Sequence, residues 1–478
     1  MLETRQYQID AIEFLKDSKN KSGKAFLFLP PGYGKSGIII RYFLDFLKND
    51  EDSKCLLVSP INTIESSWKE EVKKFDTNNE IRYANIKSID IDKHDNNFVA
   101  INPEYIQHAD KKGWLNKLLK QKFNILFIDE LTFFKNSNST RFRTLRKYAK
   151  YFKYRVGATG TPTSNGLIDL WSQFYIIDDG QTLGRLKTEY KTQYFYEHPA
   201  GFGWLPFKHS EEAIFKRIKE SGLVFAPSTD VVSKELKEPK LITAVNMIPF
   251  DDEFKSISVK LMKDLVAGEI VVANRGVLMN KLRQICNGFY YNEDEETTYI
   301  NKCELHELPK NKALTSLLQK TKIKTLLPVY WKEDFIQIKQ TLDRTNLRCI
   351  YLNTNKEKKQ LEKIVNMWNN DELDVLVFNP RTLGFGTNMQ KTVGQIIWYS
   401  LPYSFELFKQ TNCRLARNGY PEDTVMCHIL CTEDSIEEEI YKKIICKQKT
   451  HVKLFEILDE FVRINTRNET SKKQINLI

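Results

Sequence analysis

The sequence predicts two α/β lobes with parallel sheets, arranged in tandem, with a helical insertion between them. Two series of short apolar runs, each alternating with helical segments, support this fold class. The stretch between the two series is rich in lysine, tyrosine and phenylalanine and breaks the alternation. We expect a first lobe over residues 1–166, a mainly helical insertion and linker over 167–240, a second lobe over 241–462 and a polar tail over 463–478.

The composition agrees with a large protein that binds a polyanion. The chain has 478 residues, 41% of them hydrophobic, which is enough for two or three domains with buried cores. The net charge of +10 suits nucleic acid, although a lysine-rich soluble surface gives the same number. The eight cysteines form no C-x-x-C pair, and neither a signal peptide nor a membrane-spanning run is evident. We expect a cytoplasmic protein without a membrane partner.

The first lobe opens with an amphipathic helix over 5–16, followed by a glycine-rich turn at 29–36, LPPGYGKS. Gly32 and Gly34 allow backbone N–H groups to face phosphate oxygens, and Lys35 can reach the β- and γ-phosphates. The Ser36 hydroxyl can hold Mg²⁺. Leu29 stands where the full phosphate-loop pattern has glycine, so for this stretch alone a chance Gly-Lys-Ser turn is the alternative.

The later apolar runs of this lobe, at 55–59, 98–101, 125–128 and 154–158, each precede polar residues. Ligands bind at the carboxyl ends of strands in parallel sheets. Asp129 and Glu130 directly follow the third run, where the aspartate can hold Mg²⁺ through its water shell and the glutamate can orient and deprotonate a water. Such a pair is common by chance, but downstream of a Gly-Lys-Ser turn we interpret it as catalytic.

The insertion contains an aromatic stretch at 194–204, YFYEHPAGFGW. Aromatic rings beside lysines can stack on nucleic-acid bases, and a strand-separating role for this stretch is a hypothesis. More often such rings form a local core, which is the interpretation that we favour.

The second lobe shows apolar runs at 325–330, 349–352, 375–378, 395–399 and 425–430 and has no phosphate loop of its own. It offers instead two arginines, Arg414 and Arg417, whose spacing of three predicts one helical face. Two guanidinium forks can bind a phosphate that the other lobe holds. A solvated basic helix is the alternative.

In this order the motifs resemble those of the superfamily 2 helicases, and specifically their Snf2-like branch, over most of the chain from about Arg5 to Lys449. The broad motifs are RQYQ at 5–8, PGYGKS at 31–36, Asp129-Glu130, and WKEEVKKF at 68–75. More specific are GTPTSNGL at 160–167 with Leu170-Trp171, and LRQICN at 282–287. Motif V is matched by Arg381, Gly384, Gly386 and Asn388, and motif VI by Gln410, Arg414, Arg417 and Gly419. Motif II departs from the family in reading Asp-Glu-Leu-Thr, and Thr132 can replace a hydrogen bond of the usual histidine.

The resemblance implies two RecA-like lobes that bind ATP and Mg²⁺ between them. It implies that Gln8 contacts adenine and that the two arginines act as fingers on the γ-phosphate. The expected catalytic residues are Lys35, Asp129, Glu130, Arg414 and Arg417, and the expected metal ligands are Ser36 and Asp129. The expected nucleotide contacts are Gln8, Pro31, Gly32, Tyr33, Gly34, Lys35, Ser36 and Gly386. The residues expected near the nucleic-acid track or the coupling path are Ser59, Pro60, Asn102, Thr159, Thr161, Arg381, Thr382 and Gln410.

From these features we expect an ATP-dependent DNA translocase or helicase that acts on duplex or branched DNA. Its size is similar to that of phage-encoded helicases that remodel branched DNA, which would place it in a host cytoplasm. Three alternatives stay open: a motor on RNA, the motor subunit of a restriction or defence complex, and a DNA-binding scaffold that does not hydrolyse ATP.

Overall fold

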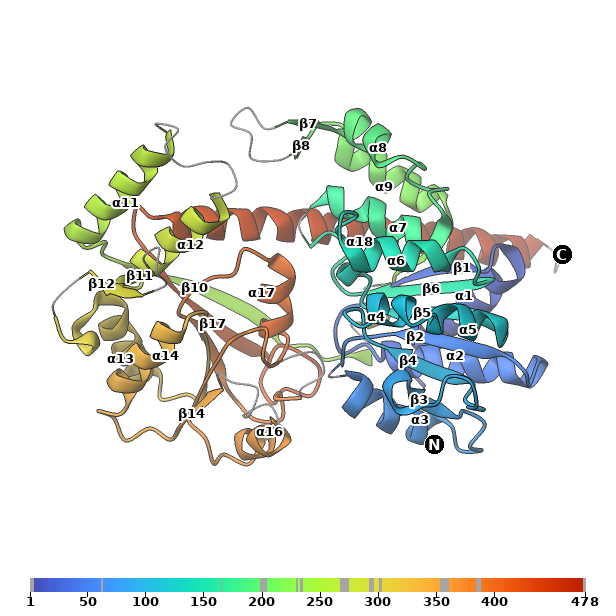
Figure 1. Ribbon diagram of the computed structural model, residues 1–478, viewed down its shortest axis with the longest axis horizontal. Helices are drawn as coiled ribbons and strands as arrows, with labels where there is room; N and C mark the ends of the chain where they lie inside the picture. The colour runs from blue at the N-terminus through green and yellow to red at the C-terminus, as the bar shows by residue number, and fades with distance from the viewer. Residues whose placement is uncertain are drawn as a thin grey trace. The chain divides into compact units, whose positions relative to one another are not determined.

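The computed structural model (Figure 1) describes the chain apart from residues 1–3, 62, 165, 198–203, 229–230, 233–234, 267–274, 292–295, 301–302, 353–360, 384–387 and 476–478. The chain folds as two compact units. The first comprises residues 1–236 together with 447–478, and the second comprises residues 237–446. The insertion expected over 167–240 therefore falls almost entirely within the first unit.

A seven-stranded sheet, parallel throughout, forms the centre of the first unit. Its five central strands are short and almost entirely buried, as the continuous apolar runs predict. In spatial order they are β3 (Tyr83–Asn85), β4 (Phe98–Ile101), β2 (Lys54–Val58), β5 (Phe123–Asp129), β6 (Tyr154–Thr159), β1 (Lys24–Phe28) and β9 (Val224–Phe225).

Helices cover both faces of this sheet and bury two separate apolar clusters. One cluster takes its residues from α1 (Gln6–Lys21), α2 (Lys35–Asn49) and α3 (Lys69–Phe75), together with a π-helical turn at Thr63–Trp68. The other takes them from α4 (Ile106–Lys111), α5 (Trp114–Lys120), α6 (Thr140–Ala149), α7 (Leu170–Asp178), α8 (Lys187–Tyr194) and α9 (Ser210–Glu220). Such two-sided cover is what an all-parallel sheet requires.

The insertion contains α7, α8 and α9, and it also contains an antiparallel hairpin of β7 (Phe195–Glu197) and β8 (Trp204–Pro206). Strand β9 then returns to the sheet and pairs with β1. Within the aromatic stretch, Tyr194 and Phe195 are buried in the core and Trp204 packs against it. These three rings agree with the local-core interpretation, while Phe202 lies outside the described residues.

The second unit contains a six-stranded sheet, again parallel throughout. Its spatial order is β10 (Lys240–Ile248), β17 (Thr424–Thr432), β16 (Gln395–Trp398), β13 (Thr325–Pro328), β15 (Val375–Phe378) and β14 (Cys349–Leu352). The helices are α11 (Asp252–Val266), α12 (Arg275–Ile285), α13 (Pro309–Thr321), α14 (Lys332–Leu342), α16 (Leu361–Asn369) and α17 (Phe405–Asn412), with a β11 (Phe289–Tyr291) and β12 (Thr297–Tyr299) hairpin. The two sheets are the parallel sheets of tandem RecA-like lobes, which confirms the predicted fold class.

The C-terminal segment differs from the expected polar tail. Helix α18 (Ile436–Ile475) begins in the second unit and continues through most of the stretch expected as a polar tail. From Lys447 onward it belongs to the first unit, where Leu454 is fully buried in the core and Lys453 forms a 2.6 Å ion pair with Glu211. None of the described helices is long and apolar enough to cross a membrane.

Candidate nucleotide-binding and catalytic site

The phosphate loop joins β1 to α2 in the first unit. Gly32 and Gly34 both have positive φ angles, 91° and 72°, which glycine adopts without steric cost. A Cβ atom at Gly34 would lie 2.5 Å from Nε2 of Gln8, so glycine at this position also allows α1 to approach the loop. The first helical N–H bond of α2 runs from Ile38 to the Gly34 carbonyl, so the preceding N–H groups of the first turn lack helical partners. These N–H groups can bind an anion at the start of α2, as the sequence predicts for this turn.

The side chains of Gln8, from α1, and Lys35, the first residue of α2, both contact this loop. The Gln8 side chain donates to the Tyr33 carbonyl at 3.4 Å and accepts from the Arg5 backbone N–H at 3.4 Å. The Lys35 ammonium donates to the carbonyls of Leu29 and Pro30 at 3.0 and 3.3 Å. An amide side chain and a cation thus meet at the start of α2, beside N–H groups that can bind an anion.

Asp129 is the last residue of β5, and one of its two carboxylate oxygens accepts hydrogen bonds from neighbouring side chains. Oδ2 accepts from the Ser59 hydroxyl at 2.9 Å and from the Trp68 indole N–H at 3.3 Å. The indole N–H lies 2.9 Å from the Ser59 hydroxyl as well, so the three groups form a closed triangle. Ser59 follows β2, the neighbour of β5 in the sheet, which explains how residues seventy positions apart meet.

Glu130 follows with a left-handed backbone, φ 70°, and is buried. This conformation turns its side chain toward β6, where Oε1 accepts from the Thr159 hydroxyl at 2.5 Å. The same oxygen accepts from the Thr132 hydroxyl at 2.8 Å, which is the hydrogen bond proposed to replace that of the family's usual histidine. The Thr159 hydroxyl in turn accepts from the Thr161 backbone N–H at 3.1 Å. Glu130 is therefore linked to the segment that follows β6.

That segment also touches the phosphate loop. A Cβ atom on Gly160 would meet the Pro31 Cδ at 2.9 Å and the Leu29 carbonyl oxygen at 3.0 Å. The carboxyl ends of β1, β5 and β6 thus bring the phosphate loop, the two acids and the segment after β6 into one contiguous site (Figure 1). Among the residues that the structure describes, no three or more His, Cys, Asp or Glu side chains gather into a group that could hold a metal ion.

The residues expected on the nucleic-acid track or coupling path are mostly buried. In the first unit Ser59, Pro60, Thr159 and Thr161 have almost no exposed surface, and Asn102 bonds to Glu104 at 3.1 Å. Ser59 and Thr159 bond directly to the two acids. These residues therefore present little surface to a ligand, and two of them connect the acids to neighbouring loops.

In the second unit, the prediction that Arg414 and Arg417 lie on one helical face is wrong. Helix α17 ends at Asn412, and the backbone then forms tight turns in which Arg414 and Leu415 bond three residues back. The side chain of Asn412 accepts from the Trp398 indole at 3.0 Å, which fixes the end of the helix. Leu415 turns fully into the core. The two arginines therefore come from a turn and not from a helix.

Arg417 is placed near the motif V segment of the same unit. Arg417 donates to the Asn388 side chain at 2.7 Å. Burial, together with the charge of Arg417, lowers the pKa of Arg414 to about 10, so Arg414 remains charged at neutral pH. Arg381 is exposed, Thr382 is largely buried, and Gln410 bonds to Glu406 at 3.3 Å. Gly386 lies outside the described residues.

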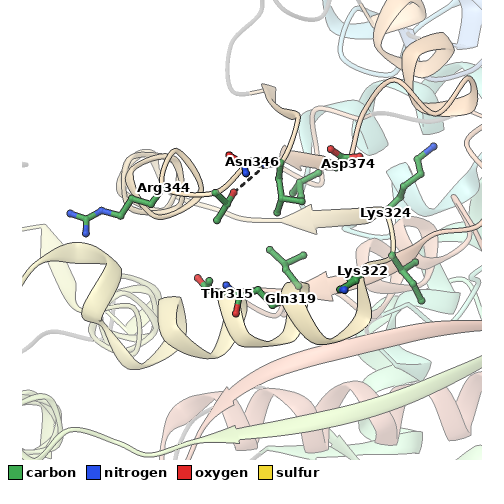
Figure 2. A pocket seen from close by; sticks show the side chains of 12 residues that line it. Thr315, Gln319, Lys322, Lys324, Arg344, Asn346 and Asp374 are labelled. Carbon is green, nitrogen blue, oxygen red and sulfur yellow. Dashed lines mark hydrogen bonds between the residues drawn. The ribbon is translucent and has the colours of Figure 1, made fainter.

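Trp68 is the site residue that the sequence left without a role. It was recognised only as part of the 68–75 stretch, and no spacing pattern relates it to Asp129, sixty-one positions away. A hollow of about 510 Å³ in the second unit is separate from the motif residues (Figure 2). It lies where β13, β14 and β15 begin, at the amino edge of the sheet, whereas the motifs follow strand ends.

Comparisons with known proteins agree with the site. Residues 1–164 match the family described as "Type III restriction enzyme, res subunit", and residues 309–419 match the helicase conserved C-terminal domain. The first match contains the phosphate loop and both acids, and the second contains both arginines. The chain belongs to the superfamily 2 helicases. As a member of this family it is an ATP hydrolase.

Relatives of this helicase include a phage protein and a bacterial one. Protein p41 of Acyrthosiphon pisum secondary endosymbiont phage 1 is 23% identical over 92% of this chain and 95% of its own length. YwqA of Bacillus subtilis, named as an ATP-dependent helicase/translocase, is 23% identical over 97% of this chain, but the chain spans only 50% of it. The solved structure of the Sulfolobus solfataricus SWI2/SNF2 ATPase core with dsDNA gives a TM-score of 0.43 at 18% identity, over 94% of this chain and 92% of that one.

Proposed function

We propose that this helicase is an ATP-driven DNA translocase that acts on duplex or branched DNA. The observation that supports it best is the chain of contacts in the first unit, from the phosphate loop through Gly160 and Thr159 to Glu130. A site of this kind lets a change at the nucleotide reach the segment after β6, which is what a motor needs and a simple ATP-binding domain does not.

In this mechanism the phosphates of ATP bind at the start of α2 and beside Lys35. Ser36 and Asp129 would hold Mg²⁺, because a hydroxyl and a carboxylate are the oxygen ligands that this ion prefers, and the Asp129 Oδ1 has no partner among the described residues. The ion would neutralise charge on the phosphates. Glu130, fixed by two hydroxyl donors, would orient the attacking water and accept its proton. Arg414 and Arg417 would supply positive charge to the γ-phosphate from the second lobe.

DNA is the proposed track because of the Snf2-like motif set and the net charge of +10. The name of YwqA, helicase/translocase, is consistent with movement along a nucleic acid. Grip on the track would come from phosphate contacts, so binding should weaken steeply as salt rises.

A second candidate is the motor subunit of a restriction or defence complex. The description of the family matched over residues 1–164, a restriction-enzyme subunit, favours it specifically. This candidate requires a partner chain that carries the nuclease, and co-purification with such a chain would distinguish it from the leading proposal.

The test is ATP hydrolysis measured without nucleic acid and then with single-stranded DNA, duplex DNA, a four-way junction and RNA. We expect duplex or junction DNA to raise the rate and RNA to leave it unchanged. Glu130→Gln serves as the blank, and its rate should fall about 10² to 10³-fold because the water loses its base.

A rate that is the same under all five conditions and no higher than the blank would contradict the proposal. Stimulation by RNA but not DNA would instead identify an RNA motor. A Lys35→Ala protein that kept its full biological function would favour the non-hydrolysing scaffold.

A further inference from the structure

A basic hollow lies on the first unit, outside the catalytic site. It measures about 550 Å³ and is bordered by the first turns of α6, by the loop between α7 and α8, and by the start of α8. Five basic side chains line it and no acidic one does: Arg143, Arg146, Arg185, Lys187 and Lys191. We refer to it as the basic hollow.

The cations of the basic hollow lack carboxylate partners among the residues that the structure describes. Arg146 stacks on the Tyr175 ring at 4.5 Å and Lys191 lies over the Trp204 ring at 4.4 Å. Lys187 donates to the Ser137 hydroxyl at 2.6 Å. Burial and the charge of Lys191 lower the pKa of Lys187, with Asp169 opposing them, which is the effect expected on a crowded cation.

Other basic residues of α6 form ion pairs, so the lack of ion pairs is specific to the cations of the basic hollow. Arg141 lies 3.5 Å from Glu104, and Lys147 lies 3.0 Å from Asp110. The hollow of the second unit in Figure 2 differs in charge, since one carboxylate, Asp374, lines it and Lys324 pairs with Asp371 at 2.7 Å. Like charges gathered without counter-charges repel one another, and a polyanion would relieve that repulsion.

The walls of the basic hollow are fixed in place. The Trp171 indole donates to the Gly184 carbonyl at 2.9 Å, which anchors the loop that presents Arg185. Lys135, just before the hollow's Ser137, bonds to the Ser164 hydroxyl at 3.1 Å and accepts a hydrogen bond from Ser172 at its carbonyl. The hollow thus adjoins the segments that follow the two acids and β6.

We propose that the basic hollow binds the phosphate backbone of nucleic acid as a second grip, separate from the residues around the two acids. Three guanidinium forks match phosphate oxygens in geometry, and a duplex backbone presents several phosphates at once. The proposal rests on the proposed DNA-translocase function and adds a binding site to it.

The test is the salt dependence of binding to a short labelled DNA duplex of random sequence, measured by fluorescence anisotropy on the full chain. Each lost phosphate contact should lower the slope of log K against log salt by about 0.9. The variant Arg143→Gln/Arg185→Gln/Lys187→Gln should therefore lower the slope by about 2 to 3. The double variant without Lys187→Gln changes only exposed side chains and should lower it by about 2, which keeps the test valid if the triple variant folds poorly.

The matched control is Lys48→Gln/Lys120→Gln/Lys150→Gln, which removes the same net charge from exposed positions of the same unit. These lysines lie where helices end and the next strand follows, at the edge of the sheet opposite the motifs. We expect this control to keep the parental slope. Equal slopes for the parent, the control and both hollow variants would overturn the proposal.

Stimulation of ATP hydrolysis by the same duplex, measured in parallel, separates this inference from the proposed function. A parent that is stimulated by DNA, with hollow variants that keep its slope, leaves the function standing and removes the second grip. A parent that binds DNA through the hollow but is not stimulated by DNA supports the second binding site and contradicts the proposed function. Binding of a poly-glutamate peptide in place of DNA would show a protein-docking surface and contradict the proposal.

Discussion

At the scale of single residues, the site depends on how each acid is held. Asp129 has one oxygen fixed by Ser59 and Trp68, whereas Glu130 has one oxygen fixed by two threonine hydroxyls. A carboxylate with one oxygen held by donors presents the other in a defined direction, which is what a metal ligand or a base requires. We therefore propose that Trp68 positions Asp129.

We predict that Trp68→Phe lowers kcat for ATP hydrolysis about tenfold or more. The substitution keeps a buried ring but removes the N–H that donates to both Ser59 and Asp129, and a hydrogen bond to a charged group contributes about 1.5 to 3 kcal/mol. Steady-state kinetics at saturating ATP, with the dependence on Mg²⁺ concentration, provide the measurement. We expect the half-saturating Mg²⁺ concentration to rise.

Tyr42→Phe is the matched control, because it also removes one buried hydrogen bond from the first unit, from the Tyr42 hydroxyl to the Leu15 carbonyl at 3.0 Å. It should lower the thermal midpoint and leave the Mg²⁺ dependence unchanged. The positioning role is refuted if both variants lose stability and activity in the same proportion and neither shifts the Mg²⁺ dependence.

At the scale of elements, strands were predictable and one helix end was not. The apolar runs ended within a few residues of the observed strands because buried strands of a parallel sheet need continuous apolar sequence. The end of α17 carries no glycine or proline signal. It depends on Asn412 bonding to Trp398 and on Leu415 entering the core, which are tertiary contacts that local sequence does not encode.

A buried ion pair connects two helices of the second unit. Lys310 at the start of α13 and Glu437 at the start of α18 lie 2.6 Å apart, each only 2% exposed. Lys310 also donates to the Asn287 side chain and to the Tyr399 carbonyl, and Glu437 accepts from the Thr432 backbone N–H. The Lys310 ammonium thus has three acceptors and each Glu437 oxygen has a donor, which makes removal of one partner costly.

We predict that Lys310→Met lowers the free energy of unfolding by about 3 to 5 kcal/mol, because it leaves the Glu437 charge buried and uncompensated. Urea unfolding would measure this loss. The double variant Lys310→Met/Glu437→Met should recover much of it, since no buried charge then remains. Additive losses in the double variant would contradict this account of the pair.

At the scale of the whole molecule, motif order identified the family, and the sheets agree with the lobes that the resemblance implied. The course of the chain was less predictable. Composition placed the end of the second lobe at residue 462, so the part of α18 that precedes this residue was expected in that lobe. The structure instead assigns residues from 447 onward to the first unit. Amphipathic sequence shows that a helix has a face to bury without showing which core receives it.

Leu454 tests this assignment. It is fully buried in the core of the first unit, and Leu→Ala substitutions at such positions cost about 2 to 5 kcal/mol. We predict that Leu454→Ala speeds backbone hydrogen exchange in peptides from residues 1–236, because opening of that unit becomes easier. Val452, on the same helix and 45% exposed, provides the control, and Val452→Ala should leave exchange unchanged. Faster exchange confined to residues 237–446 would mean instead that the end of α18 stabilises the second unit, as composition alone suggested.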